Sequence, residues 1–211
     1  MGEWGVPVVP TSIESGLDHV VLAGGTPAEW LAMSQRDWLI RLENLAEGAA
    51  SEGAHWVTVF PHHGPDFTDD ENAEFGALMG EIDGVTMLDV AHGTRYVWHH
   101  ESDVSVIVDP SADGHRRFAA TVDGLRTFGT TAEEITEEYL SKVILDPATQ
   151  EADLVVVLGP PNRIPESMVW ELAYSELVFI DIAWCDLNAN HLELAIDDFN
   201  RRHRRFGGLD S

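Results

Sequence analysis

The chain has 211 residues, with 12 basic residues against 37 acidic ones and a formal net charge of −25 at pH 7. Its apolar content of 44% is enough for one core of ordinary domain size, and so acidic a surface excludes nucleic acid as a partner and allows at most peripheral contact with a membrane. The single cysteine, Cys185, excludes an internal disulfide framework and a Cys-rich zinc site.

The first half of the chain alternates strand and helix signals. Residues 19–25 predict a short buried strand that ends in a glycine turn. Thr26 then starts a helix as its N-cap, with Pro27 at the first helical position and Glu29 completing a capping box, and apolar residues at helical spacing continue it to about Gly53. The next predicted elements are a strand at 56–60 and a helix that opens with the acidic residues 69–74 and ends near Gly84.

The second half continues the same alternation. Residues 154–158 are apolar on both faces, as expected of a central parallel strand. Thr131 and Glu134 make another capping box. We therefore expect one α/β domain over residues 18–208, preceded by an N-terminal extension at 1–17, with a largely parallel central sheet of about six strands flanked by helices. The other predicted elements are strands at 85–90, 104–108 and 177–182 and helices at about 113–127, 132–143, 167–174 and 189–205.

Two features of the sequence bear on location. Residues 1–16 carry two glutamates and no basic residue, and no apolar run reaches the ~18 residues that a membrane span needs, so we expect a cytoplasmic protein. Lys142 is the only lysine. An acid-rich, lysine-poor composition resembles the cytosolic proteins of salt-accumulating organisms and predicts a high-salt cytoplasm; an acidic mesophilic protein is the alternative.

Three segments of the chain could bind an anion. The turn at Gly24 and Gly25 leads from a strand into a helix, where backbone N–H groups can hold a phosphate, although an ordinary tight turn has the same pattern. The loop 158–163 ends in Arg163, a residue suited to bidentate phosphate contact. Four of the 12 basic residues fall within 201–205, more than complementation of a helix dipole explains, and this cationic end could close over a polyanionic ligand.

The histidines suggest a different kind of site. His62 and His63 follow a predicted strand, and with Asp66 and His115 they could bind a metal or act as acid and base. Adjacent histidines on an extended segment point to opposite sides, so such a pair offers at most one ligand to a given ion. Placement at the surface is the alternative interpretation.

The C-terminal part resembles the cis-prenyltransferases, the undecaprenyl and dehydrodolichyl diphosphate synthases. Residues 170–177, Trp-Glu-Leu-Ala-Tyr-Ser-Glu-Leu, are close to the family's W-Q-x-A-Y-[SA]-E-L, and residues 179–184 fit F-x-D-x-x-W. Residues 198–208 contain the family's closing R-R-F-G. Upstream, residues 19–22 fit the opening H-V-A-I, and Trp30 fits the tryptophan that ends the first motif.

This resemblance implies an activity and a set of sites. Members of the family elongate an allylic diphosphate with isopentenyl diphosphate, use Mg²⁺ and work as dimers. By this resemblance Arg163, Arg205 and Gly207 would bind the substrate diphosphate, and Glu176 matches a glutamate linked to the metal. The residues that the resemblance places at the dimer interface are Trp170, Tyr174, Glu176, Phe179 and Trp184.

The first motif departs from the family's pattern. Gly25 stands where the family has its catalytic aspartate, and Glu29 stands where it has a diphosphate-binding arginine, so we assign no catalytic residue. Downstream, Val157, Pro161 and Pro165 replace an arginine, a glutamate and a serine of the family. Losing even one preorganised charge-stabilising group costs an enzyme about 2.7–4 kcal/mol of barrier.

Two-component members of the family pair a catalytic subunit with a partner of the Nogo-B receptor type, which lacks the aspartate but retains the terminal R-x-G. This sequence has the same asymmetry. It predicts a non-catalytic subunit of a heteromeric cis-prenyltransferase that makes long-chain polyprenyl diphosphate of the undecaprenyl or dolichyl type, with Mg²⁺ held mainly by the partner. A homodimeric enzyme with a rebuilt site and a polyprenyl-phosphate-binding protein are the alternatives.

Overall fold

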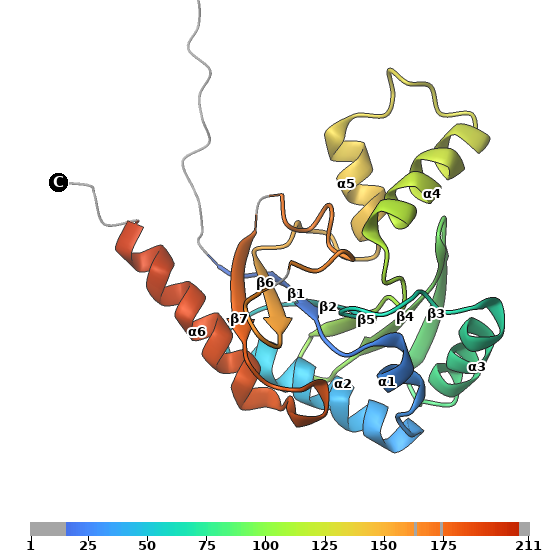
Figure 1. Ribbon diagram of the computed structural model, residues 1–211. Helices are drawn as coiled ribbons and strands as arrows, with labels where there is room; N and C mark the ends of the chain where they lie inside the picture. Colours follow the sequence, from blue (N-terminus) through green and yellow to red (C-terminus); the bar gives the residue numbers. More distant parts are fainter. Residues whose placement is uncertain (1–15, 163, 174, 207–211) are drawn as a thin grey trace, which may run out of the picture.

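The computed structural model describes residues 16–162, 164–173 and 175–206. Within these ranges seven strands form one sheet in the order β3-β4-β5-β2-β1-β6-β7 (Figure 1). The predicted α/β domain with a largely parallel sheet is confirmed. The strands are β1 (His19–Ala23), β2 (Trp56–Phe60), β3 (Val85–Val90), β4 (Gly93–His99), β5 (Ser105–Val108), β6 (Leu154–Leu158) and β7 (Glu176–Ile180).

The centre of the sheet is parallel and apolar. β1 pairs in parallel with both β2 and β6, which places Val20 opposite Val57 on one side and Leu154 on the other. These strands are buried on both faces because the sheet is covered on both sides, and this is why their sequences are continuous apolar runs. Their carboxyl ends meet along one edge of the sheet, where folds of this class bind ligands.

One edge of the sheet carries a hairpin that the sequence did not predict. β3 pairs antiparallel with β4, and β4 pairs antiparallel with β5, so the sheet has one strand more than expected. β4 contains Arg95, whose side chain is only 2% exposed and pairs with Asp109. Charged residues are rarely buried without a partner, so the arginine in this segment argues against a buried strand when the sequence is read alone. Its partner Asp109 lies 14 residues further along the chain.

The described α-helices are α1 (Pro27–Leu31), α2 (Gln35–Ala50), α3 (Asp69–Gly80), α4 (Gly114–Thr127), α5 (Glu137–Leu145) and α6 (Ala189–Phe206), and a short 3-10 helix, η1, covers Trp184–Asp186. The single helix expected after Thr26 is two, because Ser34 opens α2 with a capping box of its own to Asp37. The Thr131–Glu134 contact closes a turn, and α5 starts at Glu137. Residues 164–173 form turns where we expected a short helix.

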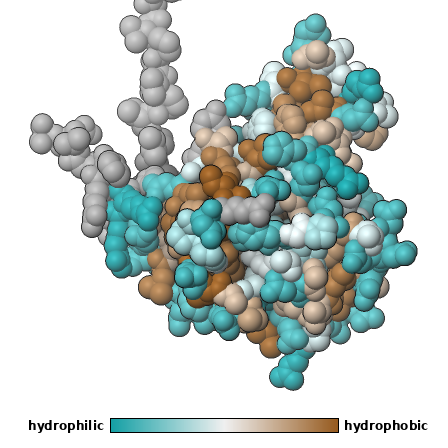
Figure 2. Space-filling model, viewed as in Figure 1, coloured by the Kyte–Doolittle hydropathy of each residue, from teal (hydrophilic) through white to brown (hydrophobic). Residues whose placement is uncertain are grey.

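The helices divide between the two faces of the sheet. α2 packs against α6 on one face, while α4 and α5 project from the other (Figure 1). The larger core contains an aromatic cluster of Trp30, Trp38, Phe75 and Trp184. Hydrophilic side chains are spread over every part of the face seen in Figure 2, with small apolar patches between them. Among the described residues no helix is both long and apolar enough to cross a bilayer.

Candidate functional site

The turn after β1 is the first candidate site, and its geometry admits only glycine at position 25. Gly25 has φ +73°, in the left-handed region that glycine tolerates best. A Cβ atom there would lie 2.7 Å from Nε1 of Trp30 and 2.8 Å from Cγ of Trp184. An aspartate side chain could be added at this turn only if two buried tryptophans moved.

Several polar groups of the same turn are already paired within the chain. The Gly24 amide donates to the Phe60 carbonyl oxygen at 3.0 Å, and Nε1 of Trp30 donates to the Gly24 carbonyl oxygen at 2.9 Å. The Thr26 amide and hydroxyl donate to Oε2 of Glu29 at 2.8 and 3.0 Å. The Glu29 carboxylate therefore occupies the amino end of α1, so an anion would meet a negative charge there.

Trp184, an expected interface residue, lies inside this chain. It is 4% exposed, its ring centroid lies 5.9 Å from that of Trp30, and Cζ of Arg41 lies 4.5 Å from its ring. Trp170 and Phe179 are half-buried, so part of each side chain faces outward. Glu176 is half-buried at the start of β7, and Tyr174 lies outside the described residues.

The predicted diphosphate ligands fall mostly outside the described side chains. Arg163 and Gly207 are not among the described residues, and of Arg205 only its place in α6 is described. Two other arginines of the cationic end pair with carboxylates one turn earlier on the helix, Arg201 with Asp197 and Arg202 with Asp198. The described part of the cluster is therefore a set of exposed i,i+4 ion pairs, each worth about 0.3–0.5 kcal/mol.

The histidine candidates do not converge. The rings of His62 and His63 contact each other with centroids 3.6 Å apart, but His115 is exposed in the first turn of α4. Asp66 accepts a hydrogen bond from the Ala112 amide at 2.8 Å and faces Arg116. Within the described ranges no three His, Cys, Asp or Glu residues are placed to share a metal ion. Gly25 also offers no carboxylate at the first motif, so neither this turn nor the described histidines supply a ready set of ligands for Mg²⁺.

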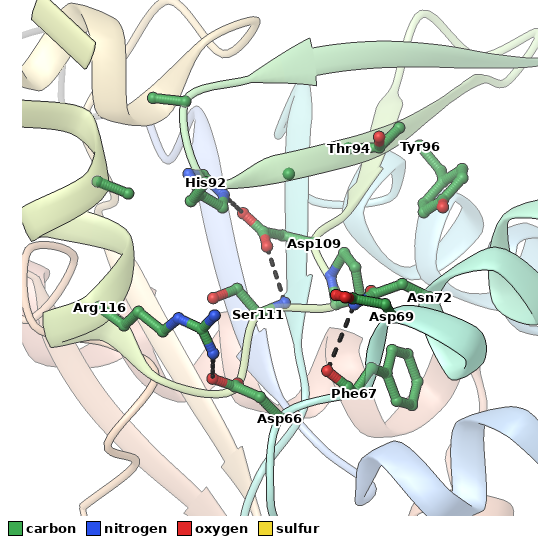
Figure 3. A pocket seen from close by; sticks show the side chains of 14 residues that line it. Asp66, Phe67, Asp69, Asn72, His92, Thr94, Tyr96, Asp109, Ser111 and Arg116 are labelled. Carbon is green, nitrogen blue, oxygen red and sulfur yellow. Dashed lines mark hydrogen bonds and ion pairs between the residues drawn. The ribbon is translucent and has the colours of Figure 1, made fainter. Parts of the chain in front are cut away.

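A pocket at the carboxyl end of β5 was not anticipated from the sequence (Figure 3). It has a volume of about 440 Å³ and lies between the turn of the β3–β4 hairpin, the start of α3 and the segment that leads into α4. The polar side chains that line it include Asp66, Asp69, His92, Asp109 and Arg116. The one signal that could have indicated it is Asp109, which follows a buried strand at the edge where ligands bind.

Asp109 is the centre of a buried polar cluster in this pocket. Its Oδ2 accepts hydrogen bonds from Nε2 of His92 at 2.9 Å and Nε of Arg95 at 2.8 Å, and its Oδ1 accepts from the Ser111 amide at 3.0 Å. Burial alone would raise the pKa of Asp109, but Arg95 and His92 outweigh burial and hold that pKa well below its usual range. Asp109 is therefore ionised and fixes the orientation of the His92 ring.

The second half of the chain is similar in sequence to known proteins. A family described as "Putative undecaprenyl diphosphate synthase" matches residues 113–207. An isoprenyl transferase of Bacillus cereus is 40% identical over 78 residues, which are 37% of this chain and 30% of that protein. The ditrans,polycis-undecaprenyl-diphosphate synthase of Yersinia pseudotuberculosis, named as specific for (2E,6E)-farnesyl diphosphate, is 40% identical over 75 residues, again 30% of its length. The match thus spans less than a third of these relatives.

Solved structures extend the likeness to the whole fold. A probable undecaprenyl diphosphate synthase from Campylobacter jejuni aligns with a TM-score of 0.55 and 14% identity, covering 91% of this chain and 99% of that one. Lavandulyl diphosphate synthase from Lavandula x intermedia, solved with dimethylallyl diphosphate, aligns with a TM-score of 0.52 and 10% identity, covering 86% and 94%. The chain therefore has the fold of the undecaprenyl diphosphate synthases, and its residues 113–207 are similar to that family in sequence.

Proposed function

We propose that this protein is a non-catalytic subunit of a heteromeric cis-prenyltransferase, which joins isopentenyl diphosphate to an allylic diphosphate. The observation that carries the proposal is the turn after β1, where Gly25 is enclosed by Trp30 and Trp184 and the Glu29 carboxylate holds the Thr26 amide. Enzymes that transfer a diphosphate-activated group need cations or amides aimed at the departing diphosphate. This turn presents a carboxylate instead.

The C-terminal end of the chain is the part that we propose contributes to the active site of the complex. The sequence similarity covers residues 113–207, which include α6 with Arg205, and the first motif lies outside the match. We propose that Arg205 and Gly207 complete the diphosphate site of a partner that carries the aspartate, and that the partner holds Mg²⁺. The outward parts of Trp170 and Phe179, with β7 at the edge of the sheet, would face that partner. Such a complex would work in the cytoplasm, at most peripheral to a membrane.

The test is reconstitution with a cis-prenyltransferase from the same organism that retains the first-motif aspartate. The two proteins are purified separately, and chain elongation is measured with radiolabelled isopentenyl diphosphate. This chain alone should give no product, and the mixture should give more than the partner alone. Turnover by this chain alone would overturn the proposal.

A matched pair of variants tests the role of the tail. Arg205→Ala should lower turnover by the complex, because a charge-assisted contact to diphosphate contributes about 1.5–3 kcal/mol. Arg201→Ala, on the same helix but paired with Asp197, should leave turnover unchanged. Equal turnover by both variants would remove Arg205 from the site.

A further inference from the structure

The strand β7 has one edge that no other described strand covers. It is the last strand in the order of the sheet and pairs in parallel with β6 on its inner side. The Glu176 amide donates to the Asp153 carbonyl oxygen at 2.9 Å, toward β6. Backbone groups alternate in direction along a strand, so the N–H and C=O groups of Leu177 and Phe179 point away from β6. Within the described ranges no group is hydrogen-bonded to this outer side.

The side chains of β7 are those of an interior strand. Leu177 and Phe179 pack against a smaller core on one face of the sheet. Val178 belongs to the larger core on the other face, and Ile180 packs against that core. Glu176, at the start of β7, is its only charged residue, and the strand contains no proline. Natural proteins guard free edges with charges, prolines or bulges, because an unguarded apolar edge pairs with other chains.

The last helix carries the cationic end of the chain beyond the same edge. α6 contacts β7, and its 18 residues give it a length of about 27 Å. Its carboxyl end projects past β7 and away from the sheet (Figure 1). The turn of α6 that contains Arg205 therefore lies on the side of the molecule to which the edge of β7 is open. A single chain bound at this edge can meet both features.

We infer that β7 takes up a strand of the catalytic partner, which extends the sheet across the interface between the two chains. This inference rests on the proposed subunit role and states how the two chains associate. The outward N–H and C=O groups of Leu177 and Phe179 form the hydrogen bonds, as in other cases of strand addition. Because β7 is apolar on both faces, the strand that fits beside it is also apolar on both faces.

A proline at position 179 tests the pairing, because it removes the outward N–H group and leaves the hydrogen bonds to β6 in place. Phe179→Ala loses the same ring but keeps the N–H group, so it is the matched control. The full chain is titrated with the aspartate-bearing partner by isothermal titration calorimetry. Phe179→Pro should bind about tenfold more weakly than Phe179→Ala, as expected for one lost hydrogen bond. Equal affinities of the two variants would overturn the inference.

Amide hydrogen exchange in the unsubstituted chain gives a second readout, which remains available if Phe179→Pro fails to fold. In the free protein the amides of Leu177 and Phe179 should exchange faster than those of Val178 and Ile180, which face β6. Binding of the partner should slow exchange at Leu177 and Phe179 by about tenfold or more. The amides of β3, at the opposite edge of the sheet, are the control and should not change. Unchanged exchange at Leu177 and Phe179 in the complex would contradict the pairing.

The outcomes separate this inference from the proposed subunit role. If the partner gains turnover from this chain but exchange in β7 does not change, the subunit role stands and the strand pairing is wrong. If the partner neither binds this chain nor gains turnover, both are wrong. Light scattering after size-exclusion chromatography should show that this chain alone is a monomer. A dimer that Phe179→Pro dissociates and Phe179→Ala does not would mean that a second copy, and not the partner, takes this edge.

Discussion

Arg117 in α4 and Glu171, 54 residues later, form an ion pair in the interior of the domain. Nη2 of the guanidinium lies 2.7 Å from Oε1 and 2.9 Å from Oε2 of the carboxylate, and the two side chains are 2% and 1% exposed. Cζ of Arg117 also lies 4.2 Å from the ring of Phe60 in β2. The pair ties α4 to the turns at 164–173, a segment without helix hydrogen bonds to hold it.

Breaking this pair from one side should destabilise the fold. Arg117→Met leaves the Glu171 carboxylate buried without its partner, and we expect a loss of about 3–5 kcal/mol in the free energy of unfolding. The double variant Arg117→Met, Glu171→Met removes both charges and should recover most of that loss. Urea titrations followed by circular dichroism measure both. A double variant as unstable as the single one would show that packing, not charge, dominates at this site.

Gly25 offers a second prediction, because its conformation and its surroundings both exclude a side chain. Gly53 has a similar φ, +87°, but a Cβ added there meets nothing within 4 Å. Gly53→Ala therefore reports the cost of the left-handed backbone alone. Gly25→Ala should cost about 1–3 kcal/mol more, the usual range for overpacking a core. Equal melting temperatures for the two variants would mean that Trp30 and Trp184 can move aside.

The same clash predicts the outcome of restoring the family's carboxylate. Gly25→Asp should be less stable than Gly25→Ala and should not give the isolated chain prenyltransferase activity, because Glu29 still faces the turn. Elongation assays compare the activity of the single variant Gly25→Asp with that of the double variant Gly25→Asp, Glu29→Arg. Magnesium-dependent turnover by the first variant would show that the loss of one carboxylate is all that separates this chain from an active synthase.

The parts of the fold that local chemistry determines could be predicted from the sequence. The Thr26–Glu29 capping box, with Thr26 Oγ1 accepting from the Glu29 amide, places the start of α1 correctly. The break before α2 also has a local signal, a capping box between Ser34 and Asp37. The usual capping box has glutamate or glutamine at the third position, so the aspartate made this one easy to overlook. Apolar runs predicted β1 and β6 because no charged residue interrupts them.

The parts that depend on distant partners could not be predicted. Arg95 obscures β4 because its burial is favourable only with distant partners, the Asp109 carboxylate just after β5 and the Asp146 carbonyl oxygen. His92 and Asp109 are 17 residues apart, and no spacing rule brings the end of a hairpin to the end of a parallel strand. The resemblance identified the family's residues at positions 25 and 29, but not the tryptophan rings that close the space around them.

Salt should stabilise this protein through its charge. With a net charge of −25, repulsion between carboxylates is strongest when the Debye length is long, and it is screened at high ionic strength. The melting temperature should rise between about 0.05 M and about 2 M KCl. The double variant Glu74→Gln, Glu81→Gln removes two exposed carboxylates at α3 and should make the melting temperature less dependent on KCl. A melting temperature that does not change with KCl would exclude adaptation to a high-salt cytoplasm.

Asp109 gives a prediction for the effect of pH on stability. Its pKa is lowered in the folded state by Arg95 and His92 despite burial, so its ionisation stabilises the fold fully above the unfolded pKa of about 3.9. That contribution is lost as the pH falls below about 4 towards the lower folded pKa. Asp109→Asn should cost about 3–5 kcal/mol at pH 7, because Arg95 is left buried without its counter-charge.

The variant should also change the shape of the pH profile. Asp109→Asn should lose less stability than the unsubstituted protein between pH 4 and pH 3, roughly the range over which the unfolded carboxyl group becomes protonated. Asp123→Asn, which removes an exposed carboxylate paired with Arg126, is the control and should keep the original profile. Urea titrations at each pH measure the three proteins. Parallel profiles for Asp109→Asn and Asp123→Asn would mean that Asp109 is not held ionised by the Arg95 and His92 contacts.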